Sequence, residues 1–171
     1  MIGALAGVAV VVLVILWLRR RYVVVTVHGE SMLPTYRPGE RLVVRRTSPR
    51  SLRTGQVVVL AGVPRGSRAG AVGGSVAGLV GEPVAGATRG SLAEETGTGW
   101  IVKRVAAVPG DPIPRDTVPA LRTAPGTRVP AGHLVVLGDN ADRSYDSRRS
   151  GYMTTDRLLG VVLRKVGQPL R

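Results

Sequence analysis

The sequence contains no cysteine and no phenylalanine, and only two of its 24 basic residues are lysines. Without cysteine the chain can form no disulfide, no thiolate nucleophile and no cysteine-ligated metal site. Arginine stays protonated in proteins, whereas lysine can lose its proton when it is desolvated. The candidates for a base near neutral pH are therefore few: Lys103 and Lys165, and the histidines His28 and His133.

Acidic residues are also scarce, because 11 of them stand against 24 basic ones and leave a net charge of +13. This charge has two possible explanations. It can result from an arginine-rich composition with no specific partner, or it can attract the protein to anionic lipid headgroups. Nucleic acid is not expected as a partner, since no helix-turn-helix pattern, zinc-ligand spacing or aromatic-basic alternation is present. No metal or cofactor is implied.

Aromatic residues make up only 4% of the chain, and valine, leucine and alanine supply its apolar mass. Valine favours strands, so the expected fold class is mostly β. At 171 residues the chain suits one domain plus an anchor. Short β-branched runs predict neighbouring strands at residues 41–46 and 56–60, and further strands at residues 22–27, 100–108, 133–140 and 158–166.

Residues 62–99 differ from the rest of the chain. They hold 11 of the 23 glycines and no aromatic residue. Segments of this composition rarely bury enough apolar area to order themselves. We therefore expect a flexible insertion or long loop at residues 62–99.

The N-terminal 18 residues carry no charged side chain, and Arg19, Arg20 and Arg21 follow them. A helix of that length measures about 27 Å, near the short end for a membrane span, and Trp17 lies where an interfacial aromatic is expected. A cleaved signal peptide would need a basic leader and a small-residue cleavage site, which are missing. We expect a single-pass anchor at residues 1–18 and a catalytic domain at residues 19–171.

The orientation of this anchor stays open. The basic residues follow the apolar run, so the positive-inside rule places the domain in the cytoplasm. A start site assigned too late, which would hide a basic leader, gives the same pattern.

Ser31 follows the anchor closely, and a serine hydroxyl needs a base to become a nucleophile. In a strand over residues 100–108, Lys103 shares a face with Ile101 and Val105, and Arg104 points the other way. An ammonium among apolar side chains is destabilised relative to the neutral amine, which can accept a proton. Lys103 is therefore the preferred base.

The other candidate bases have weaker support. Lys165 lies beside Arg164 near the C-terminus and is expected to be a solvated side chain at the end of a strand. The spacing of His28 and His133 supports no Ser-His-Asp triad.

Three segments, GESMLPT (29–35), VKRVAAVPGD (102–111) and GDNADRSYDSRRSG (138–151), resemble the serine, lysine and C-terminal boxes of type I signal peptidases, in the family's order. TGQVVVL (54–60) resembles the remaining box, with Gln56 where an acidic residue is usual. The resemblance implies a coiled antiparallel β-sheet catalytic domain. The second, non-catalytic subdomain of larger members would be nearly absent, because only residues 112–137 are available for it.

The resemblance also implies roles for individual residues. Ser31 is the expected nucleophile, with its backbone N–H as an oxyanion donor, and Lys103 is the expected general base. Met32 would help to line the substrate groove. Gly29 stands where some members hold a second, side-chain oxyanion donor. Ser144 would hydrogen-bond the lysine amine, while Asp146 and Arg148 would brace the site. Asp139 and Asn140 are interpreted as a polar turn.

The implied function is a membrane-bound serine endopeptidase with an extracytoplasmic domain, which removes signal peptides from exported preproteins with small residues before the cleavage site. One alternative is a dedicated maturation protease for a single precursor, such as that of nickel superoxide dismutase. Another is a non-catalytic membrane-surface binding module, against which Ser31 and Lys103 argue. Self-cleaving repressors share the dyad, but they would need a DNA-binding domain, for which no segment is available.

Overall fold

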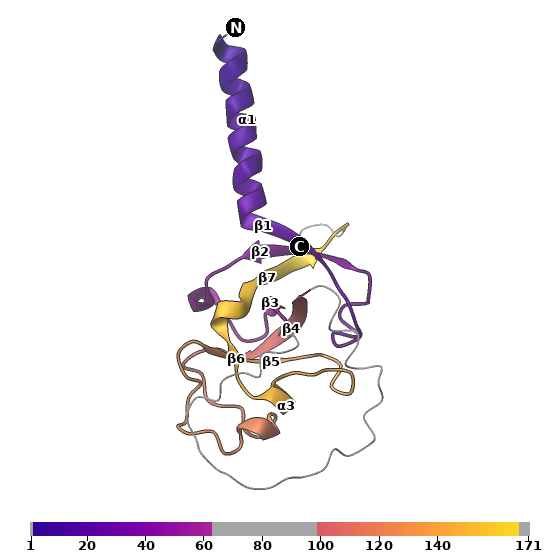
Figure 1. The fold of residues 1–171 in the computed structure, drawn as a ribbon, viewed down its shortest axis with the longest axis vertical. Coiled ribbons are helices and arrows are strands. Elements are labelled where there is room, and N and C mark those ends of the chain that lie inside the picture. The colour runs from indigo at the N-terminus through magenta and orange to yellow at the C-terminus, as the bar shows by residue number, and fades with distance from the viewer. Residues whose placement is uncertain (1, 63–98, 168–171) are drawn as a thin grey trace.

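The computed structural model describes residues 2–62 and 99–167, with side chains from residue 8 onward. The insertion expected at residues 62–99 therefore lies almost wholly outside the described residues. A long helix leads into a mostly β domain (Figure 1). The strands are β1 Tyr22–Thr26, β2 Arg41–Arg46, β3 Val57–Ala61, β4 Trp100–Ala107, β5 His133–Leu137, β6 Met153–Thr154 and β7 Leu158–Lys165. The helices are α1 Ile2–Arg21, α3 Ser147–Ser150, and the 3-10 turns η1 Pro49–Ser51, η3 Pro119–Leu121 and η4 Thr155–Arg157.

One antiparallel seven-stranded sheet forms the domain, in the order β1-β2-β7-β3-β4-β5-β6. The expectation that the strands at 41–46 and 56–60 are neighbours is wrong, because β7 lies between β2 and β3 and pairs with both. The eight-residue β7 is largely apolar, and three consecutive residues of it, Leu159 to Val161, are buried between these two strands. Its Gly160 passes close to the backbone of β2, where a Cβ atom would lie 2.7 Å from the carbonyl carbon of Arg45.

The helix α1 projects away from the sheet, and β1, β2 and β7 lie beside its base (Figure 1). Its described apolar side chains are exposed: Val8, Val10, Val11, Val12, Leu13, Val14, Ile15, Leu16, Trp17 and Leu18. Over the residues that the structure describes, no helix has both the length and the apolar character needed to cross a membrane. The transmembrane helix expected at residues 1–18 is therefore not found in that part of the chain.

Three groups of buried apolar side chains stabilise the domain. Two of them involve β3, whose Val57 and Val59 belong to one group and whose Val58 and Leu60 belong to the other. This alternation follows from the two-residue repeat of a strand. The third group lies in the connection between β4 and β5, around Ile113, Val118, Leu121 and Val129. The connection at residues 112–132, which is too short for a large subdomain, thus packs a small core against Ala107 of β4 and Val135 of β5.

Candidate functional site

The Ser31 turn joins β1 to β2. It begins after Val27, whose N–H donates to the Glu40 carbonyl oxygen at 2.8 Å and so closes the base of the loop. Gly29 has a φ of 76°, a conformation that favours glycine. A side-chain oxyanion donor at that position would therefore strain the backbone. Ser31 itself is 9% exposed, and its carbonyl oxygen accepts a hydrogen bond from the Asn140 N–H at 3.0 Å.

Lys103 lies in the middle of β4, which is flanked by β3 and β5. Its cross-strand partner is Val58, and its neighbour on the same face is Val105, both of which are buried. Lys103 is only 1% exposed, and its Nζ donates to the Ser144 Oγ at 3.1 Å. The structure therefore places a buried amine on the face that the sequence predicts and gives it the predicted hydroxyl partner.

Gly138, immediately after β5, lies where these groups converge. A Cβ atom at this position would lie 2.6 Å from the Ser144 Cβ and 2.6 Å from the Ser31 carbonyl oxygen. Only a residue without a side chain lets the Ser31 turn and the Ser144 loop approach each other this closely. Because Ser144 in turn accepts from Lys103, three segments far apart in the sequence meet around Gly138.

Asp146 holds the segment that carries Ser144. Its side chain is completely buried and accepts from the Gly138 N–H at 2.7 Å, from the Arg148 N–H at 3.0 Å and from Arg148 Nη1 at 2.9 Å. Arg148 Nη2 also donates to the Gly138 carbonyl oxygen at 3.0 Å. Asp146 thus caps α3 and, with Arg148, fixes both backbone polar groups of Gly138. The structure brings together the pair that the resemblance assigns to bracing.

Removing this brace should destabilise the domain. Replacing Asp146 by alanine leaves the Gly138 N–H and the Arg148 guanidinium without their carboxylate, which typically costs about 3–5 kcal/mol for a buried pair. We expect a loss of that size in the free energy of unfolding, measured by urea denaturation. The exposed Asp142 provides the control, because D142A should change stability by less than about 0.5 kcal/mol. If D146A and D142A lowered the free energy of unfolding equally, Asp146 would not be the brace of the Ser144 segment.

Asp139 is more than a turn residue. Its carboxylate receives two hydrogen bonds from Arg104, from Nε at 2.8 Å and from Nη2 at 2.7 Å, and a third from the Thr35 hydroxyl at 2.5 Å. The Arg104 hydrogen bond holds the pKa of Asp139 below its ordinary value, and the Thr35 hydrogen bond acts in the same direction against partial desolvation. Arg104 points away from Lys103, so this network ties the Ser31 turn to β4 from the other face of the sheet.

The Asp139 network is the part of the site that sequence reasoning missed. Arg104 and Thr35 both lie in segments that resemble the family's boxes. The sequence therefore already showed a guanidinium next to Lys103 and a hydroxyl close to Ser31, which are two possible partners for a carboxylate. Pairing them required knowing that the Ser31 turn lies over the end of β5.

This network predicts an acid-sensitive contribution to stability. Because the folded-state pKa of Asp139 is lowered, its contribution is present above the ordinary pKa of about 4 and is lost as the pH falls through the folded-state value. The D139N variant should be about 2 kcal/mol less stable than wild type near pH 6, and this gap should shrink near pH 3. Urea denaturation at both pH values measures it. D116N, at an exposed carboxylate, should show no such gap.

Met32 differs from the prediction. Its side chain is 0% exposed and belongs to the core with Val25, Leu42 and Val102. It therefore supports the Ser31 turn from within the core and does not face an open groove.

The other candidate bases have different surroundings. Lys165 is not simply solvated, since its Nζ pairs with Glu40 Oε1 at 2.8 Å and lies 5.3 Å from the centre of the Tyr36 ring. That hydrogen bond lowers the pKa of Glu40. His133 begins β5, the strand whose far end precedes Gly138, and its Nδ1 lies 3.0 Å from the Ala131 carbonyl oxygen. His28 is exposed. Among the described residues, no group of three histidine, aspartate or glutamate side chains could hold a metal ion.

The chain matches a known protein family. The family model described as signal peptidase, peptidase S26, matches residues 2–118 and 115–166, which together span nearly the whole chain. No curated protein matches the chain. The matched stretches include the Ser31 turn, β4 and the segment from Gly138 to Gly151.

Proposed function

The chain belongs to the signal peptidase family, peptidase S26, which makes it a serine peptidase-type hydrolase, and we propose that Ser31 is its nucleophile and Lys103 its general base. The buried amine of Lys103, hydrogen-bonded to Ser144, is the observation that carries the proposal. A lysine enclosed by valines on an interior strand contributes little to stability, so a chemical role is the better explanation for its position.

The arrangement supports a two-step mechanism. Lys103 Nζ takes the proton of the Ser31 hydroxyl as its Oγ attacks the peptide carbonyl carbon, and the backbone N–H of Ser31 stabilises the oxyanion. The resulting ammonium, held in place by Ser144, gives the proton to the leaving amine. The neutral amine then activates a water molecule that hydrolyses the acyl-enzyme ester and frees Ser31. With glycine at position 29, no side chain there contributes to the oxyanion site, a loss worth about 3 kcal/mol in other enzymes.

The proposed substrates are preproteins with small residues before the cleavage site. A dedicated maturation protease for one precursor is the second candidate. The small core between β4 and β5 favours it, because a minimal domain leaves little surface for binding large substrates.

We further propose that α1 attaches the domain to a membrane. Its described side chains from Val8 to Leu18 are apolar and exposed, and a helix that is apolar all round needs an apolar environment. A reporter fused after Arg171 tests the orientation. An exterior reporter supports cleavage of exported preproteins, and a cytoplasmic one favours the dedicated protease.

Replacing Ser31 by alanine tests the nucleophile. The full chain in mild detergent should cleave a peptide that contains an Ala-x-Ala site, and S31A should lose that activity by at least about 10³-fold because no oxygen remains to attack. Ser51, an exposed serine on η1, provides the control, and S51A should keep full activity. Cleavage by S31A at more than a tenth of the wild-type rate would exclude Ser31 as the nucleophile.

The pH profile distinguishes an amine base from a histidine. The rate of cleavage should rise with pH, because only the neutral amine of Lys103 accepts a proton. A profile with its inflection near 6.5, the ordinary pKa of histidine, would point to an imidazole base.

A further inference from the structure

We propose that five exposed arginines around the base of α1 form a binding surface for the anionic headgroups of a lipid bilayer. We call this surface the arginine collar, and it consists of Arg19, Arg20, Arg21, Arg45 and Arg46. The inference deepens the proposed function, since it rests on the proposed attachment of α1 to a membrane.

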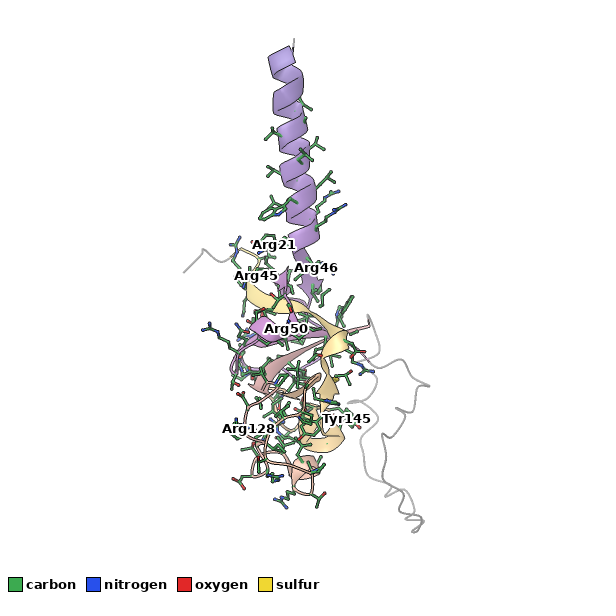
Figure 2. All side chains as sticks on the ribbon, turned by 90° about the vertical axis from the view of Figure 1, so that its left-hand side faces the viewer. Arg21, Arg45, Arg46, Arg50, Arg128 and Tyr145 are labelled. Atoms are coloured by element: carbon green, nitrogen blue, oxygen red, sulfur yellow. The ribbon has the colours of Figure 1, made fainter. Side chains whose placement is uncertain are left out.

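Two distant segments build the collar. Arg19, Arg20 and Arg21 form the last turn of α1, and β1 begins at the next residue, Tyr22. Tyr22 pairs with Arg45 across β1 and β2, so the end of β2 lies at the base of the helix. Figure 2 shows Arg21, Arg45 and Arg46 gathered there, whereas Arg128 lies at the other end of the domain.

Among the residues that the structure describes, no nearby acid neutralises the collar. Residues 1–28, 41–62 and 157–167 contain no aspartate or glutamate, and these three stretches supply α1 and the adjacent strands β1, β2, β7 and β3. In the described part of the chain, no acidic side chain lies within ion-pair distance of a collar arginine.

The acid that comes closest along β2 lies at its other end. Glu40 precedes Arg41 and pairs with Lys165, so the six residues of β2 separate it from the end of the strand. That length is about 20 Å, which exceeds the Debye length of about 8 Å at physiological ionic strength. Glu40 is therefore too distant to reduce the positive potential of the collar appreciably.

The apolar side chains around the collar favour a bilayer over nucleic acid. Trp17 is 56% exposed, and the Arg21 guanidinium lies 5.6 Å from the centre of its ring. Leu16 and Leu18 on α1, and Val24 on β1, are also exposed. Tryptophan next to arginine, between an apolar helix and a polar domain, suits the headgroup region of a membrane. Duplex DNA offers phosphates for the arginines, but it has no apolar region in which exposed leucine and tryptophan side chains could be buried.

Vesicle flotation of the full chain tests the proposal. The measured quantity is the ratio of two partition coefficients, one for phosphatidylcholine vesicles that contain phosphatidylglycerol and one for vesicles of phosphatidylcholine alone. The contribution of the apolar helix cancels in this ratio. Each surface arginine changes binding to anionic membranes roughly five-fold. R45Q/R46Q should therefore lower the ratio by roughly 30-fold at low salt.

A matched pair of arginines provides the control. Arg122 and Arg128 are exposed and lie outside the collar, and R122Q/R128Q removes the same charge. This variant should leave the ratio within about two-fold of wild type. Equal losses in both variants would show that net charge alone acts and would overturn the proposal. A second collar variant, R19Q/R20Q on the exposed helix turn, covers the case in which R45Q/R46Q does not fold.

Two further readouts separate the alternatives. If a duplex oligonucleotide binds the wild-type chain through Arg45 and Arg46 more tightly than the anionic vesicles do, the lipid assignment is overturned. Cleavage of a short soluble peptide should be unchanged in R45Q/R46Q, because the collar is remote from Ser31 along β1 and β2. If the wild-type chain cleaves no peptide but still prefers anionic vesicles, the proposed peptidase activity is contradicted and the proposed lipid binding by the collar is not.

Discussion

Replacing Lys103 by methionine should lower the rate of peptide cleavage by about 10³- to 10⁴-fold while the domain stays folded. Without the amine, the proposed dyad has no base to accept the Ser31 proton. Methionine has a similar length and no polar atom to desolvate, so it should occupy the space beside Val58 and Val105 with little change in stability. Cleavage assays and urea denaturation measure the two effects separately.

The chain provides its own control, because Lys165 is the only other lysine. The K165M variant loses the ion pair with Glu40, which is partly exposed and contributes about 1 kcal/mol or less. It should retain most of the cleavage activity. If K103M keeps more than a tenth of the wild-type rate, or if K165M is the inactive variant, the proposed dyad is wrong.

Replacing Gly138 by alanine should abolish cleavage and lower the free energy of unfolding by about 3 kcal/mol. The added Cβ would lie 2.6 Å from the Ser31 carbonyl oxygen and 2.6 Å from the Ser144 Cβ, far inside normal contact distances. Relief requires the Ser31 turn and the Ser144 loop to separate, and that movement also displaces the hydroxyl that orients Lys103. The same methyl group therefore affects stability and activity together.

Two other glycines separate these effects. At Gly62 a Cβ would make only ordinary contacts, the nearest at 3.5 Å from the Gly99 carbonyl oxygen, so G62A should behave as wild type. At Gly160 a Cβ would collide with the backbone of Arg45, between β7 and β2. G160A should destabilise the domain, and the molecules that remain folded should cleave normally. If G138A loses no more activity per folded molecule than G160A, Gly138 has no special place in the site.

The strands could largely be predicted from the sequence, because runs of β-branched residues are local signals. The predicted ranges differ from β1, β2, β4 and β7 by at most one residue, and the predicted range for β3 is shifted by one residue at both ends. The predicted strand at 133–140 continued past Leu137, where Gly138 begins the turn that carries Asp139. The repeat of apolar residues cannot predict where β5 ends, because the strand ends where the Ser31 turn packs against Gly138.

The order of the strands could not be predicted in the same way. Sequence proximity suggested that β2 and β3 are neighbours, yet β7 from the C-terminal end lies between them. Any two of these valine-rich strands could pair equally well by local preference alone. Gly160, which permits β7 to approach the backbone of Arg45, reveals its role only when both strands are in place.

Residue types and local spacing were enough to identify the chemistry available to this protein: Ser31 in a turn, Lys103 on the apolar face of a strand, and no cysteine. Those facts depend on residue types and on the two-residue repeat of a strand, both of which are local. Three other features could be seen only in the folded chain: Met32 is buried in the core, Arg104 and Thr35 hold Asp139, and Arg45 and Arg46 lie beside Arg21. Each of these is a contact between segments far apart in the chain, and such contacts are set by the packing of the whole sheet.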